Sequence, residues 1–273
     1  MKVVLFCGGN GMRLRGYVDD VPKPMVPIGT RPILWHLMKY YAHFGHKDFI
    51  LCLGYKGNAI KDYFLQYDES VSNDFVWSQG GKKINFLSRD IDDWTITFVE
   101  TGFNATIGER LKAVEPHLVG EETFLANYGD GLSDVPLPDM VDSFEKSRAV
   151  GSLLLVQPTA SFDLVHADRG GVVKDICALN RTDIWINGGF FILRNEIFRH
   201  IQPGDELIRE PFQRLIEKEA LLAYKYTGFW QCMDTFKDKQ RLEELNQGVA
   251  PWKVWNRLPL QESETSKAMS IRA

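Results

Sequence analysis

Short apolar runs alternate with amphipathic stretches along most of this chain, and the alternation predicts strands and helices in turn. The runs Val3–Cys7 and Phe49–Leu53 contain no polar position, which is typical of strands buried on both faces of a sheet. Other strands are expected at about 96–100, 123–126, 151–156, 172–176, 189–193 and 221–226. Helices are expected at about 32–44, 58–65, 138–146, 211–218 and 236–246. This order of elements indicates an α/β fold with a mixed, mainly parallel sheet flanked by helices.

Two polar segments interrupt this pattern. Residues 67–93 contain a Gly80-Gly81 turn, so we expect an insertion with a short hairpin that serves as a lid or a subunit contact. Residues 257–273 are expected to form a loose C-terminal tail. The rest of the pattern predicts a single domain over residues 1–256.

A glycine-rich turn, Gly8-Gly9-Asn10-Gly11-Met12-Arg13, directly follows the first predicted strand. Glycines at the end of a strand let backbone N–H groups approach a phosphate closely. Arg13 adds a forked cation, and Lys23 in a Pro-Lys-Pro turn adds a second charge. The spacing matches neither G-x-x-x-x-G-K-[ST] nor G-x-G-x-x-G, so neither a P-loop nor a dinucleotide fold is indicated. We therefore expect this turn to hold a triphosphate.

Two further motifs carry candidate ligands. Asp130 follows an apolar strand and is flanked by glycines, which predicts a carboxylate in the ligand crevice at the carboxyl edge of the sheet. Carboxylates suit Mg²⁺, whereas a turn-forming aspartate is the alternative. The triplet Asn187-Gly188-Gly189 offers an amide that donates and accepts hydrogen bonds, with room for a sugar ring beside the glycines. A simple turn is the alternative there.

These motifs, taken in order, resemble the signature of sugar-1-phosphate nucleotidyltransferases, which is a strand followed by G-G-x-G-x-R-L and then P-K-P-M. The resemblance covers about residues 1–256. The later matching segments are Ile33–Met38, Gly54–Gly57, Tyr128–Gly131, Asn187–Phe191 and Gly228–Thr235. Within the family, the segments Trp94–Gly102 and Ala250–Trp255 are most similar to the glucose-1-phosphate cytidylyltransferases.

The resemblance implies a nucleotidyltransferase fold, in which a Rossmann-like nucleotide-binding half joins a sugar-binding half. Arg13 would bind the β- and γ-phosphates, Lys23 would bind the α-phosphate or the sugar phosphate, and both would be catalytic. Asp130 and Asp234 would hold Mg²⁺. The alternative for Asp234 is that it caps the helix that follows, a role that Thr235 could take instead. Nucleotide contacts are also implied for Phe6, Cys7, Gly8, Gly9, Asn10, Gly11, Met12, Ala105, Arg110 and Gly129. Asn187, Gly188 and Gly189 would contact the sugar phosphate.

The chain departs from the family pattern at three positions. Ala105 stands where related cytidylyltransferases have a serine, so one contact to the base or ribose is missing. Glu109 stands where the family has a glycine. The lysine of the family's Glu-Lys-Pro motif is absent, because Ala178-Leu179-Asn180 occupies that place. Arg181 is the nearest cation that could bind the sugar phosphate instead, with a solvated loop arginine as the alternative.

Composition narrows the classes of protein further. The 273 residues carry a net charge of −4 and no basic run, which argues against nucleic-acid binding. No apolar stretch approaches the ~20 residues of a membrane span, and the first residues enter a strand at once, leaving no signal peptide. Four separated cysteines fit reduced core residues of a cytoplasmic protein.

The sequence therefore predicts a cytoplasmic, Mg²⁺-dependent enzyme that transfers a nucleotidyl group from an NTP to a sugar 1-phosphate. The resemblance favours CTP as the NTP and glucose 1-phosphate or a modified sugar as the acceptor, and it implies a homo-oligomer. One alternative is the same chemistry with another NTP. Another is a non-catalytic regulatory homologue that binds a nucleotide-sugar. A glycosyltransferase is disfavoured, because Tyr128-Gly129-Asp130 lacks the first aspartate of an Asp-x-Asp motif.

Overall fold

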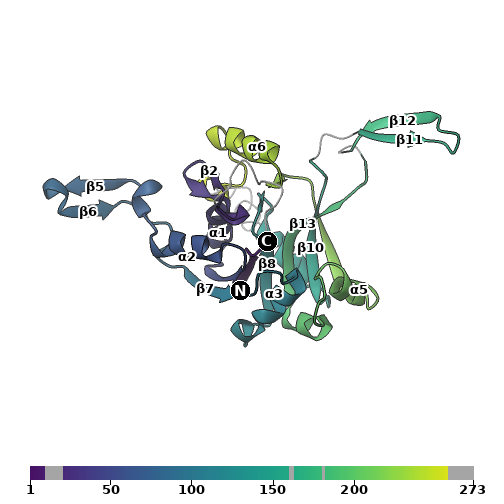
Figure 1. Ribbon diagram of the computed structural model, residues 1–273, viewed down its shortest axis with the longest axis horizontal. Helices are drawn as coiled ribbons and strands as arrows, with labels where there is room; N and C mark the ends of the chain where they lie inside the picture. The colour runs from purple at the N-terminus through teal and green to yellow at the C-terminus, as the bar shows by residue number, and fades with distance from the viewer. Residues whose placement is uncertain (10–20, 160–162, 180–181, 258–273) are drawn as a thin grey trace, which may run out of the picture.

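A seven-stranded sheet forms the centre of the molecule in the computed structural model (Figure 1), which describes residues 1–9, 21–159, 163–179 and 182–257. The strands, in order across the sheet, are β14 (Leu221–Tyr226), β10 (Gly151–Val156), β13 (Ile186–Arg194), β8 (Thr123–Tyr128), β1 (Val3–Phe6), β4 (Asp48–Leu53) and β7 (Thr95–Glu100). Strand β13 runs antiparallel to β8 and β10, and the other neighbouring pairs are parallel. The predicted mixed, mainly parallel sheet is confirmed.

Helices cover both faces of this sheet, as the apolar strands require. The α-helices are α1 (Ile33–His43), α2 (Gly57–Leu65), α3 (Ile107–Ala113), α4 (Leu137–Glu145), α5 (Glu210–Ile216) and α6 (Phe236–Gln247). Alternate residues of β1 face different cores. Val3 and Leu5 pack with residues of α1 and α4, whereas Val4 and Phe6 pack with residues of α3 and α5. This two-sided burial explains the unbroken apolar run at the start of the chain.

Short elements complete the described chain. The 3-10 helices are η2 (Lys23–Met25), η3 (Glu69–Val71), η4 (Gln79–Gly81), η5 (Glu115–Leu118), η7 (Asn195–His200) and η8 (Val254–Asn256). The two-stranded ladders pair β2 (Pro27–Ile28) with β3 (Arg31–Pro32), β9 (Gly131–Ser133) with β15 (Trp230–Cys232), β5 (Phe75–Ser78) with β6 (Lys83–Phe86), and β11 (Asp163–Ala167) with β12 (Val173–Ala178). The strand predicted at 172–176 therefore belongs to a hairpin rather than to the central sheet.

The hairpins β5–β6 and β11–β12 extend from opposite ends of the molecule (Figure 1). The first is the hairpin expected within 67–93, whose role as a lid or subunit contact stays a prediction. Its base is fixed by Arg31, whose side chain is only 3% exposed. The Arg31 guanidinium donates hydrogen bonds to Ser72 Oγ at 2.6 Å and to the Asp68 carbonyl at 2.7 Å. It also lies 4.3 Å from the Tyr67 ring centroid, so the arm joins the body through a dense polar contact.

A buried histidine connects helix α1 to the C-terminal part of the described chain. Trp252 donates from Nε1 to His36 Nδ1 at 3.3 Å, and His36 Nε2 lies 3.0 Å from the Ile28 carbonyl oxygen. Because an indole N–H can only donate, Nδ1 accepts and Nε2 carries the proton. Burial lowers the pKa of His36 to about 4, so the ring is neutral at neutral pH.

The cysteines only partly match the expectation of core residues. All four are free, and Cys7 and Cys52 are buried in the sheet. Cys177 and Cys232 are instead partly exposed, because β12 and β15 lie outside the central sheet. Among the helices that the structure describes, none has the length and apolar character to cross a bilayer.

Candidate active site

Lys23, Asp130 and Asp234 come together at the carboxyl edge of the sheet. Asp130 follows β8, and Asp234 follows β15. The β9–β15 ladder brings these two segments side by side, with Gly131 paired to Cys232 and the Met233 N–H donating to the Asp130 carbonyl oxygen at 2.9 Å. Lys23 Nζ lies 2.5 Å from one oxygen of each carboxylate. Three residues far apart in the sequence therefore share one charged cluster.

The two carboxylates keep Lys23 in its charged form. Burial by itself would lower the pKa of this half-buried lysine, but the charges and hydrogen bonds of Asp130 and Asp234 outweigh burial, so its pKa is raised. Thr235 caps helix α6 by accepting a hydrogen bond from the Asp238 N–H at 3.2 Å. Of the two alternative caps that the sequence offers, Thr235 is the one used, so Asp234 is not required as the cap.

The end of β1 lies against the loop that carries Asp130. A Cβ atom on Gly129 would lie 3.2 Å from the Phe6 carbonyl oxygen and 3.4 Å from Cys7 Sγ, so the backbones approach closely here. Burial raises the pKa of the Cys7 thiol well above its usual value. Cys7 is thus a neutral packing residue at the edge of the site, and Gly8 continues the chain toward the glycine-rich turn.

Arg110 holds three segments at this edge of the sheet. Its guanidinium donates to the carbonyl oxygens of Gly8 at 3.0 Å, Leu53 at 3.1 Å and Gly102 at 2.9 Å, and to Thr101 Oγ1 at 2.7 Å. The side chain is 3% exposed. A Cβ atom on Gly8 would lie 2.0 Å from Arg110 Nη1, so only glycine fits beside this guanidinium.

The helix that carries Arg110 explains the glutamate that departs from the family pattern. Thr106 and Glu109 form a capping box, in which the Thr106 hydroxyl accepts from the Glu109 N–H at 3.1 Å and the Glu109 carboxylate accepts from the Thr106 N–H at 2.8 Å. Glu109 therefore fixes the start of α3. Ala105 is the residue that precedes this cap and is half-buried.

The Asn187-Gly188-Gly189 triplet lies at the start of β13, beside β8 and β15. Asn187 Oδ1 accepts from the Gly189 N–H at 2.9 Å, and Trp230 Nε1 donates to the Gly188 carbonyl oxygen at 2.8 Å. Gly189 has a φ of +76°, and a Cβ atom there would lie 2.6 Å from the Tyr128 ring. Glycine is thus required by both conformation and packing. The Asn187 amide nitrogen is 3.5 Å from the Tyr128 hydroxyl.

Several predicted site residues lie outside the described part of the chain. These are Asn10, Gly11, Met12 and Arg13 of the glycine-rich turn, together with Arg181. The described residues at both borders of the turn, Gly9 and Lys23, belong to the same edge of the sheet as Asp130. The roles predicted for Arg13 and Arg181 stay predictions.

The sequence predicts no role for two residues at the carboxyl edge of the sheet, Tyr128 and Lys225. Tyr128 contacts both the Asn187-Gly188-Gly189 triplet and Phe6, whose ring centroid lies 6.3 Å from that of Tyr128. Its place at the carboxyl end of β8, directly before Gly129-Asp130, is the signal that marks it. Lys225 lies in register with Asn187 across β10, because both residues pair with Leu155. Its Nζ is 4.8 Å from the ring centroid of Trp185.

An open hollow lies at the opposite edge of the sheet, lined by Met1, Lys2, Gly45, Lys47, Asp48, Asp93, Thr95 and Glu121. These residues lie at or near the amino ends of β1, β4, β7 and β8. Ligands of open α/β sheets bind outside the carboxyl ends of the strands. Since Lys23, Asp130 and Asp234 converge at the carboxyl ends, we assign the site to that edge.

Comparisons with known proteins show which family the chain is similar to. A family model described as nucleotidyl transferase matches residues 2–238. The glucose-1-phosphate cytidylyltransferase of Salmonella typhimurium is 38% identical over 258 residues, which is 93% of this chain and 100% of that protein. The glucose-1-phosphate cytidylyltransferase of Salmonella typhi is 37% identical over 257 residues, with the same two coverages.

Solved structures share the fold at lower identity. A structure of UDP-glucose pyrophosphorylase complexed with UDP-glucose matches with a TM-score of 0.66 at 17% identity, covering 90% of this chain and 98% of that one. HddC from Yersinia pseudotuberculosis, complexed with GMP-PN, matches with a TM-score of 0.62 at 21% identity, covering 89% and 98%. At these identities the likeness bears on the fold alone.

Proposed function

This chain belongs to the nucleotidyl transferase family, and we propose that it transfers the cytidylyl group of CTP to a sugar 1-phosphate, releasing pyrophosphate. The convergence of Lys23, Asp130 and Asp234 is the observation that carries the proposal, because it joins a cation to two potential metal ligands where phosphates would bind. Glucose 1-phosphate is the acceptor favoured by the relatives' names, and CTP is favoured on the same ground.

The reaction is an in-line displacement at phosphorus. An oxygen of the sugar 1-phosphate attacks the α-phosphorus of CTP, and the bond from that phosphorus to the bridging oxygen of pyrophosphate breaks. A phosphate monoester has its second pKa near ~6, so it is ionised at neutral pH and needs no general base. Catalysis then depends on positioning and on neutralising negative charge, as in other phosphoryl-type transfers.

Lys23 supplies part of the neutralising charge, because its ammonium is held in the charged form at the centre of the site. Asp130 and Asp234 fit Mg²⁺, since both carboxylates already converge on a single cation. Magnesium prefers oxygen ligands and commonly takes one or two carboxylates together with substrate phosphates. When bound, it would offset charge on the transferred phosphate group.

Arg110 supports nucleotide binding through the backbone that it fixes. The Gly8 carbonyl oxygen and the Thr101-Gly102 segment are held by one guanidinium, so the end of β1 is placed before the nucleotide arrives. This is a positioning role. A direct contact between Arg110 and the nucleotide stays a prediction.

Two cations are candidates for the acceptor phosphate, since the family lysine is missing. Arg181 follows the vacated position, and Lys225 faces the same side of the sheet as Asn187. A dianionic phosphate in a partly desolvated site needs such a partner. Substituting each by alanine separates them, because loss of the true partner raises KM for the sugar phosphate and leaves KM for CTP nearly unchanged.

A pyrophosphate-release assay tests the proposal directly. Each of CTP, UTP, dTTP, GTP and ATP is offered with Mg²⁺ and a panel of sugar 1-phosphates that includes glucose 1-phosphate. The proposal expects turnover to be highest with CTP. Preference for another NTP would move the assignment to that base, and binding of CDP-sugars without turnover of any pair would identify a non-catalytic homologue.

A further inference from the structure

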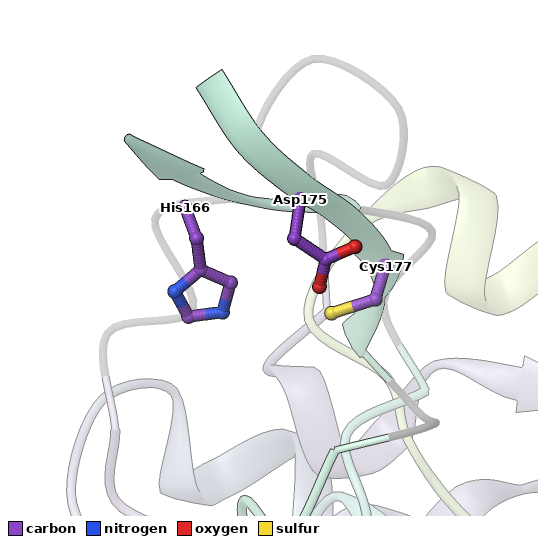
Figure 2. Close-up of side chains that lie close together, drawn as sticks. All are labelled: His166, Asp175 and Cys177. Atoms are coloured by element: carbon purple, nitrogen blue, oxygen red, sulfur yellow. The ribbon is translucent and has the colours of Figure 1, made fainter. Parts of the chain in front are cut away.

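The β11–β12 hairpin carries three potential metal ligands on one of its faces. His166 is paired directly with Asp175 across the hairpin, and Cys177 is two residues further along the same strand as Asp175. Directly paired residues and residues two apart on a strand share a face. A ring nitrogen of His166, a carboxylate oxygen of Asp175 and the Cys177 sulfur all lie within 4.8 Å of one another. Figure 2 shows the three side chains close together beside the hairpin.

The turn of the hairpin fixes the spacing of these residues. The Asp168 carboxylate accepts hydrogen bonds from the Gly170 N–H at 2.9 Å and the Val172 N–H at 3.0 Å, and it forms an ion pair with Lys174 at 3.0 Å. The register shifts beside the turn, because Ala167 pairs with Val173 whereas His166 pairs with Asp175. This irregularity places Asp175, rather than Lys174, opposite His166.

Within the described part of the chain, the three side chains are not used in other polar contacts or in either apolar core. None of them forms a hydrogen bond or an ion pair with a described residue. They do not belong to either apolar core, since the hairpin projects away from the sheet (Figure 1). The other face of the hairpin carries Val165 and Ile176, which are 55% and 62% exposed.

We propose that His166, Asp175 and Cys177 bind a thiophilic divalent transition metal, with Zn²⁺ as the ion that the donor set fits best. Imidazole, carboxylate and thiolate are the three ligand types that zinc uses in proteins. Mg²⁺ prefers oxygen ligands alone, so this site is chemically separate from the one at Asp130 and Asp234. A water molecule would complete the coordination.

The geometry needs only side-chain adjustment. Zinc–ligand bonds of about 2.0–2.3 Å in a tetrahedron place ligand atoms roughly 3.3–3.8 Å apart. The three atoms need to close from separations of at most 4.8 Å, and rotation about side-chain bonds supplies movements of this size. On binding, the Cys177 thiol loses its proton to solvent and a metal–sulfur bond forms.

Such a metal ion would bridge the two strands of the hairpin, because each strand would supply at least one ligand. A two-stranded hairpin is marginally stable alone in water, and among the described strands β11 and β12 pair only with each other. Because His166 belongs to β11 and the other two ligands belong to β12, one ion would fix the register of the whole hairpin. The role that this geometry supports is to hold the hairpin together, outside the proposed nucleotidyl transfer chemistry.

Cobalt is the probe that tests this proposal, because Co²⁺ replaces Zn²⁺ and reports thiolate ligation by a sulfur-to-metal charge-transfer band. The full chain is reduced, freed of reductant under anaerobic conditions and titrated with Co²⁺ in excess Mg²⁺. We expect one equivalent to give the band, and added Zn²⁺ to remove it. C177S should abolish the band, whereas C232S, which changes the other partly exposed cysteine, should keep it.

The histidine is tested in the same way. H166N should weaken cobalt binding at least ~10-fold, whereas H117N at an exposed position elsewhere should not. In wild type but not in C177S, Zn²⁺ should slow backbone hydrogen exchange in β11 and β12. Absence of the band in wild type, its survival in C177S, or equal exchange in both proteins with Zn²⁺ would overturn the proposal.

Discussion

Asp130 offers the sharpest test at the scale of single residues, because its substitution by asparagine removes one charge while preserving shape. We expect Asp130→Asn to lower kcat at least ~100-fold, the usual order for lost stabilisation of transition-state charge. The measurement is pyrophosphate release at limiting Mg²⁺. Asp139→Asn is the matched control, because Asp139 is an exposed residue of α4. Near-normal turnover of Asp130→Asn would remove this carboxylate from the metal site.

His36 couples stability to pH. Burial lowers its pKa to about 4, against an ordinary value of 6.5. Between these two pH values the ring therefore binds a proton in the unfolded chain but not in the folded chain. The folded state therefore loses stability as pH falls from about 6.5 to 4, by up to roughly 3 kcal/mol.

The expected loss can be measured by urea unfolding of wild type and of His36→Gln across this pH range. The glutamine variant should be less stable at pH 7 but should show a shallower decline below pH 6.5. His117→Gln, at an exposed position, should decline as wild type does. Equal slopes for wild type and His36→Gln would mean that His36 does not titrate as its burial implies.

At the scale of elements, the Arg31 guanidinium is one of the contacts that join the base of the arm formed by residues 67–93 to the body. Lysine cannot reproduce the fork with which Arg31 reaches Ser72, Asp68 and Tyr63. Arg31→Lys should therefore cost about 1–3 kcal/mol of stability and speed hydrogen exchange in the arm. Arg89→Lys changes an exposed ion pair and should have little effect. An unchanged exchange pattern in Arg31→Lys would show that other contacts hold the arm.

Elements buried on both faces could be predicted from the sequence, whereas short ladders could not. Strands β1 and β4 appear in the sequence as continuous apolar runs, so the sequence predicts their bounds to within one residue. The strands β9 and β15 have three residues each and pair across about a third of the chain, so no local periodicity marks them. The sequence predicts the hairpin strand β12 as a strand but not its place outside the central sheet, because Val172, Val173 and Ile176 resemble a half-buried strand although they are over half exposed.

Residues of the candidate site could be predicted from the sequence where they belong to a recognisable motif. Lys23, Asp130 and Asp234 were identified from their flanking residues, but their mutual contacts follow from the ladder and not from any spacing. Arg110 was expected near the nucleotide, yet its bonds to backbone carbonyls depend on how three strand ends are arranged. Every residue has a backbone carbonyl oxygen, so the sequence does not show which of these oxygens accept a hydrogen bond from Arg110.

For the whole molecule, ligand binding should appear as added stability. CTP with Mg²⁺ binds only the folded chain under the proposed function, so it should raise Tm more than ATP, GTP or UTP does. At 100 times Kd the gain is about 2.7 kcal/mol, which corresponds to roughly 5–10 °C for a chain of this length. Thermal unfolding with each nucleotide measures this. A larger shift with a purine nucleotide would contradict the preference for CTP.

The β9–β15 ladder also means that the candidate site is completed late in the synthesis of the chain. Lys23 and Asp130 leave the ribosome long before Asp234, whose segment is the last to pair. Contacts between distant segments form late in folding, and chains synthesised from the N-terminus fold in that order. The nascent chain therefore holds one acidic partner for Lys23 until residues 230–234 arrive, and a message cut short before them yields a chain with two of the three charged residues of this cluster.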